Sequence, residues 1–130
     1  MRAPFVLLLF VAAGSLLAGC SAPAPPQQAC TMMGCEDGLS VVVEGTPVGA
    51  YRIEARAAGG ETRVRECASP QQCGAVFFAG FLPEEVTVEV IGGAQRSSRT
   101  VRPVVESVQP NGRDCPPTCR QARVTVPWPG

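Results

Sequence analysis

The stretch that decides the fold is Ala50–Ala57, "AYRIEARA", in which the apolar Tyr51, Ile53 and Ala55 alternate with charged side chains. A period of two places the apolar members on one face of a strand, so the segment predicts a sheet with one buried face. Gly59 and Gly60 follow, and then the strand-like "ETRVREC". Residues 50–67 therefore predict a β-hairpin.

Similar short segments recur on both sides of this hairpin. They are "LSVVVEG" (Leu39–Gly45), "VTVEVI" (Val86–Ile91), the polar "AQRSSRTVRP" (Ala94–Pro103) and "RQARVTVP" (Arg120–Pro127). Glycine and proline separate these segments, and no stretch after the N-terminus predicts a helix longer than a turn or two. Residues 30–130 thus predict one all-β domain, a small disulfide-stabilised β-sandwich of about six to seven strands.

The N-terminus has the pattern of an export signal. Arg2 precedes "FVLLLFVAAGSLLA" (Phe5–Ala18), an apolar run of 14 residues. As a helix this run is about 21 Å long, which is short for a hydrocarbon core of about 30 Å. Residues 1–19 therefore predict a targeting segment that is removed from the mature protein.

The four residues Leu17-Ala18-Gly19-Cys20 resemble the bacterial lipobox. The resemblance implies cleavage between Gly19 and Cys20, with diacylglycerol and a further acyl chain such as palmitate attached to the new terminus. Such chains hold a protein firmly at a membrane. Ser21 then favours the outer membrane if the cell is Gram-negative. The alternative is an ordinary signal peptide with an incidental cysteine.

A proline-rich tether follows the lipidated cysteine. Residues 20–29 include "SAPAPPQQA", which holds three prolines and no large apolar side chain. Polyproline spacing gives its nine residues a reach of about 28 Å. The tether is therefore expected to lift the domain off the bilayer.

Composition argues against several kinds of function. The sequence has no histidine, the commonest general base and metal ligand. Its 11 basic and 11 acidic residues balance, so no basic excess is present to bind nucleic acid. No nucleophile with a base is evident either. We expect a protein that is not an enzyme, with no cofactor and no catalytic or metal-binding residues.

The cysteines predict disulfide bonds. If Cys20 carries lipid, six of the seven cysteines remain: Cys30, Cys35, Cys67, Cys73, Cys115 and Cys119. Export leads to an oxidising compartment, where six cysteines form three bridges in one of fifteen pairings. Three local pairs are favoured, and the main alternative exchanges partners between the Cys30–Cys35 segment and the C-terminal pair. The spacing of "CPPTC" (Cys115–Cys119) is not that of a redox pair.

A second resemblance concerns the fold. "PVGAYRIEA" (Pro47–Ala55) is similar to the Pro-x-Gly-x-Tyr segment of carboxypeptidase-regulatory-like and related prealbumin-like or Ig-like sandwiches. The match covers nine residues. It implies a β-sandwich and carries no function.

Few side chains are candidates for binding. Phe77 and Phe78 in "FFAGF" and Trp128 in "VPWPG" either fill the core or contact a partner. Met32 and Met33, between Cys30 and Cys35, supply soft atoms suited to Cu(I), although a flexible loop would look the same. Arg96, Arg99 and Arg102 predict a solvated strand face, and the alternative is a docking surface for an acidic partner or lipid headgroups.

The sequence as a whole predicts a lipid-anchored protein of the bacterial cell envelope. Its expected role is a noncatalytic interaction or accessory module that contacts the membrane through its lipid and binds an envelope protein. The alternative is a small-ligand-binding or metal-binding lipoprotein.

Overall fold

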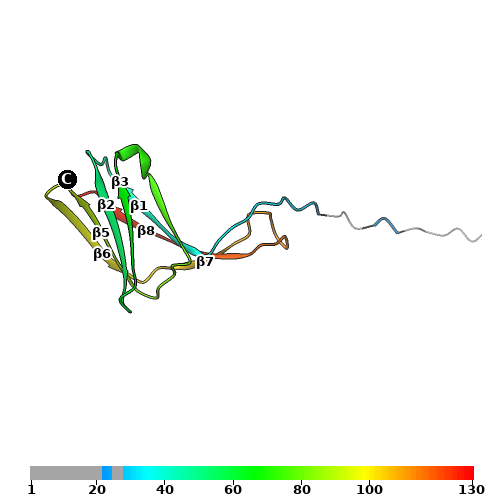
Figure 1. Ribbon diagram of the computed structural model, residues 1–130. Helices are drawn as coiled ribbons and strands as arrows, with labels where there is room; N and C mark the ends of the chain where they lie inside the picture. The colour runs from blue at the N-terminus through cyan, green and yellow to red at the C-terminus, as the bar shows by residue number, and fades with distance from the viewer. Residues whose placement is uncertain (1–21, 25–27) are drawn as a thin grey trace, which may run out of the picture.

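The computed structural model describes residues 22–24 and 28–130, and confirms an all-β fold of two facing sheets (Figure 1). The elements are β1 (Gly38–Glu44), β2 (Tyr51–Ala57), β3 (Thr62–Cys67), the 3₁₀ turn η1 (Pro70–Gln72), β4 (Ala75–Ala79), β5 (Val86–Gly92), β6 (Gln95–Val101), β7 (Val105–Val108) and β8 (Cys119–Pro127). The described residues therefore form eight strands, where about six to seven were expected. The additional strands are β4 and β7.

Each sheet has four strands. One has the order β4-β1-β8-β7 and the other the order β3-β2-β5-β6. The hairpin predicted over residues 50–67 is confirmed, because β2 and β3 pair antiparallel from Tyr51↔Cys67 to Arg56↔Thr62. β1 and β8 are the first and last strands in the sequence. They lie side by side and run parallel, with Gly38 opposite Gln121. The other strand pairs are antiparallel.

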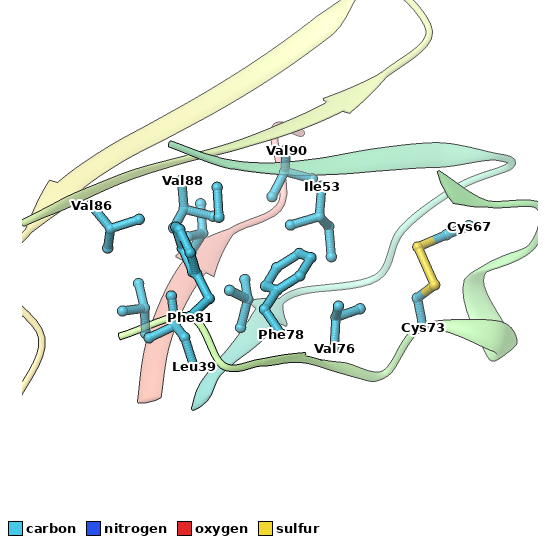
Figure 2. Close-up of a cluster of buried hydrophobic side chains, with 14 of the residues drawn as sticks. Leu39, Ile53, Cys67, Cys73, Val76, Phe78, Phe81, Val86, Val88 and Val90 are labelled. Carbon is cyan, nitrogen blue, oxygen red and sulfur yellow. A yellow bond between two sulfur atoms is a disulfide. The ribbon is translucent and has the colours of Figure 1, made fainter. Parts of the chain in front are cut away.

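The core lies between the sheets and is built by alternate residues of the strands (Figure 2). Its fully buried members are Leu39, Val41, Ile53, Ala55, Cys67, Phe81, Val86, Val88, Val90 and Val126. Fully burying a valine, leucine or isoleucine side chain stabilises a fold by about 1.5–3 kcal/mol. Burial of these alternating side chains of β1, β2, β5 and β8 therefore contributes strongly to the stability of the fold.

The β4 strand uses its apolar side chains on both faces. Phe78 of β4 and Phe81, two residues after the strand, enter the core, where their rings meet edge to face with centroids 6.3 Å apart. Phe77 lies on the outer face across Gly38, where a Cβ atom would come within 2.5 Å of the Phe77 ring and of the Phe78 carbonyl oxygen. A glycine at position 38 is thus needed for β4 to pack on β1.

The predicted signal segment, including Gly19 and Cys20, lies outside the described residues, as does part of the predicted tether over residues 20–29. Within residues 22–24 and 28–130 no helix has the length and apolar character to cross a membrane.

Candidate functional site

All six cysteines of the domain form disulfide bonds. Cys67 bonds to Cys73, as favoured from the sequence. The local pairs expected at the other two positions are wrong: Cys30 bonds to Cys115 and Cys35 bonds to Cys119, with Cα–Cα distances of 5.6 and 6.1 Å. The structure thus has the exchanged pairing that was the main alternative.

The parallel pairing of β1 and β8 explains this exchange. Because the two strands run in the same direction, the segments that lead into them also lie side by side, beyond one end of the sandwich (Figure 1). The cysteines have similar spacing in the two segments: Cys35 follows Cys30 by five positions, and Cys119 follows Cys115 by four. Two bridges can therefore join the segments side by side. We call residues 30–36 and 109–119 the disulfide end.

Asn111 holds the two segments of the disulfide end together between the bridges. Its side-chain oxygen accepts hydrogen bonds from Thr31 Oγ1 at 2.7 Å and from Met33 N at 2.8 Å. Its side-chain nitrogen donates to the Met33 carbonyl at 2.8 Å and to the Pro116 carbonyl at 2.7 Å. An amide side chain has two donor hydrogens and one acceptor oxygen, and all of them are used here. Sequence reasoning missed Asn111, because "PNG" resembles an ordinary turn.

The disulfide end also carries exposed apolar side chains. Met32 is 99% exposed and Met33 is 60% exposed, and they line a shallow groove with Pro116 and Pro117. Because the sulfur atoms of Cys30 and Cys35 are in disulfides, they are not available as thiolate ligands for Cu(I). Only the thioethers of Met32 and Met33 remain as soft ligands in this segment. No three His, Cys, Asp or Glu side chains within the described ranges gather to hold a metal ion.

The aromatic residues proposed as partner contacts occupy three different places. Phe78 is 7% exposed, so the contact proposed for it is wrong: its position in β4 points its ring into the core. Phe77 is half-buried on the outer face of β4. Trp128 is half-buried and packs against the core, over Gly92 of β5.

Trp128 and Tyr51 close one edge of the core together. Their rings meet edge to face with centroids 5.4 Å apart, and the Tyr51 hydroxyl donates a 2.6 Å hydrogen bond to the Cys73 carbonyl. Burial raises the pKa of Tyr51 above its ordinary value, because the tyrosinate would lose its hydration. This cluster joins β2, the Cys67–Cys73 loop and the C-terminal segment.

The arginines on and after β6 make separate contacts. Arg96 lies 3.6 Å from Glu89 and Arg102 lies 3.5 Å from Glu85. Arg99 instead reaches the other sheet, where its Nη1 donates a 2.7 Å hydrogen bond to the Thr125 carbonyl of β8. The solvated face expected of this strand is therefore also a contact between the two sheets.

Comparison of the chain with protein-family models, with curated proteins and with solved structures finds no match.

Proposed function

We propose that this protein is a lipid-anchored protein of the bacterial cell envelope whose β-sandwich is a noncatalytic interaction module. The observation that carries the proposal is the pairing of the cysteines. Six of the seven form disulfides, which leaves Cys20, the cysteine of the lipobox-like sequence. Three disulfides in so small a domain are typical of exported proteins, and a lipid on Cys20 accounts for the seventh cysteine.

The position of the disulfide end supports anchoring at that end. The chain enters the domain there, and its C-terminus lies at the opposite end of the sandwich (Figure 1). A lipid on Cys20 would therefore hold the disulfide end toward the bilayer.

Replacement of the lipidated atom tests the anchor. We expect Cys20→Ser in the full-length protein to abolish labelling by a palmitate analogue and to block cleavage of residues 1–19. Ser21→Ala is the control and should keep both. Labelling of the Cys20→Ser variant equal to that of the wild type would overturn the proposal.

A second candidate function is a small-ligand-binding lipoprotein, which the groove beside Met32 and Met33 favours. Native mass spectrometry of the purified protein separates the two. A bound mass that is lost in Met32→Ser/Met33→Ser would support the ligand carrier. The protein mass with its lipid alone would favour the interaction module.

A further inference from the structure

Within the described residues, the second half of the last strand has an edge with which no strand pairs. β1 pairs with β8 along its length, from Gly38↔Gln121 to Glu44↔Pro127. On the other side of β8, β7 pairs only with Cys119–Ala122. Among residues 28–130, therefore, no strand pairs with Arg123–Pro127 on the side that β7 covers earlier. A strand edge of this kind presents backbone groups that another chain can pair with. The Thr125 carbonyl already accepts a hydrogen bond from Arg99, and Pro127 has no N–H, so a paired strand would use the remaining backbone groups and displace Arg99 from Thr125.

A basic groove runs along this edge. We call it the arginine groove; it is lined by Arg99, Val101, Arg102, Pro103, Val104, Arg123, Val124 and Thr125. Three of these residues are cationic and none is acidic. The groove therefore favours an acidic occupant over a basic one.

The arginines retain capacity to bind. A guanidinium has five N–H donors, and Arg99 uses one of them on the Thr125 carbonyl. The side chain of Arg102 is 84% exposed beside Glu85. Arg123 is exposed and makes no ion pair within the part of the chain that the structure describes.

Apolar surface lies beside these charges. Val104 is 77% exposed, and Val101 is partly buried against the core. Val104 and Arg123 are both exposed and line the groove together. A segment that carries both acidic and apolar side chains can therefore contact the arginines and the exposed valine at once.

We propose that the arginine groove binds an extended acidic segment of a partner protein, which adds as a strand to β8 at Arg123–Pro127. The backbone would supply affinity through hydrogen bonds, and the arginines would select for acidic side chains. This inference deepens the proposed function by naming the partner's chemistry. The groove lies beyond β7 toward the C-terminus, away from the disulfide end, so an anchored protein would leave it accessible.

The probe is a fluorescent synthetic peptide of alternating glutamate and valine, titrated with full-length protein in detergent and followed by anisotropy. We expect saturable binding that weakens as salt is added, and no binding of the matching lysine–valine peptide. Arg102→Glu/Arg123→Glu should weaken binding about tenfold, because it reverses two charges at the groove.

The matched control is Arg65→Glu, because Arg65 is exposed on β3, at the far edge of the other sheet. It should bind the peptide as the wild type does. If the double Glu variant is unfolded by circular dichroism, Arg102→Ala/Arg123→Ala replaces it. Equal affinity of a folded groove variant and the wild type would overturn the proposal.

A second peptide tests strand addition itself. Methylation of alternate backbone nitrogens keeps every charge but removes the donors needed for pairing, so we expect binding to be lost. Retained binding would contradict strand addition, and so would tight binding of anionic phospholipid vesicles that outcompetes the peptide. Cys20→Ser should bind the peptide normally. Lipidation is therefore tested by palmitate labelling and the groove by peptide binding, and either proposal can be overturned without the other.

Discussion

Tyr51 shows how one side chain joins three parts of this fold. It begins β2, its hydroxyl donates to the Cys73 carbonyl in the Cys67–Cys73 loop, and its ring meets Trp128 after the last strand. The chain contains one tyrosine and one tryptophan. Tyrosine absorbance and tryptophan fluorescence therefore each report on a single, known position.

The first prediction concerns alkaline pH. Burial raises the pKa of Tyr51 in the folded protein above the ordinary tyrosine value of about 10. Below that pH the hydroxyl is protonated in both states, and the free energy of unfolding is unaffected. As the pH rises further, the unfolded chain ionises first, so we expect stability to fall until the folded-state pKa is passed.

Tyrosinate absorbance in native buffer and in urea measures the two ionisation midpoints directly. Tyr51→Phe should remove this contribution to the pH dependence and cost about 1 kcal/mol at neutral pH, through the lost hydrogen bond to Cys73. Equal midpoints in the folded and unfolded protein would contradict the prediction.

The second prediction compares three glycines. A Cβ at Gly38 would meet the backbone carbonyl of Phe78 at 2.5 Å, whereas one at Gly92 would meet only the tip of the Trp128 ring. Because the ring can move more easily than a strand, we expect Gly38→Ala to destabilise by about 1–3 kcal/mol and Gly92→Ala by less.

Urea unfolding measures both changes, and Trp128 fluorescence should shift in Gly92→Ala alone. Gly74→Ala is the control, since nothing lies within 4 Å of its Cβ position. The reverse order of destabilisation would show that β1 and β4 are less closely packed than described.

At the scale of elements, the alternation of side chains predicts strands well but not their neighbours. Tyr51, Ile53 and Ala55 predicted β2, and the valines of β5 predicted a buried face. β4 was missed because Phe77 and Phe78 are both apolar and hide the alternation, and β7 has only four residues.

The disulfide pairing could not be derived from the same pattern. It depends on β1 lying parallel to β8, with Gly38 opposite Gln121, and a periodic sequence contains no signal for which strands are adjacent. Phe78 and Trp128 illustrate the same difficulty for the candidate site. Composition marks them as large aromatic residues, but only the register of β4 and the position of Gly92 determine where their rings lie.

The third prediction concerns the two disulfides of the disulfide end. Their sequence separations are 85 and 84. While one remains, the other closes only a further loop of about ten residues, worth about 2.7 kcal/mol on the chain-entropy model. Once both are removed, the long loop opens as well, which costs about 4.5 kcal/mol more.

We therefore expect Cys30→Ser/Cys115→Ser and Cys35→Ser/Cys119→Ser each to stay folded and to lose about 2.7 kcal/mol of stability. The fourfold variant should lose about 7 kcal/mol, which is roughly 2 kcal/mol more than the two double variants together. Urea unfolding gives the comparison, and peptide mapping without reduction verifies the remaining bridges. Additive losses would contradict this prediction. Cys67→Ser/Cys73→Ser, which opens a separation of 6, is the control for removing one bridge elsewhere.

At the scale of the whole molecule, both sheets share one core. Side chains of β1, β2, β4, β5 and β8 belong to the same buried cluster, which Trp128 packs against. Among the apolar side chains that the described residues bury, Cys115 and Cys119 alone lie outside this cluster, in the disulfide end. The stability of either sheet thus depends on the other.

The fourth prediction is that the oxidised domain unfolds in one cooperative transition. Trp128 fluorescence and the far-ultraviolet circular dichroism of the strands should change at the same urea concentration. Arg99→Ala, which removes a contact between the sheets, should shift both signals together. Separate midpoints would show that the sheets unfold independently.

The bond between Cys30 and Cys115 also decides how the molecule bears tension. A pull applied between the N-terminal tether and the C-terminus passes through this bond and then along residues 115–130. Residues 31–114 are bypassed by this covalent route. If the protein is anchored at its N-terminus and a partner is bound at β8, a pulling force passes through the last strand. Most of the other strands then lie outside the covalent path that carries the force.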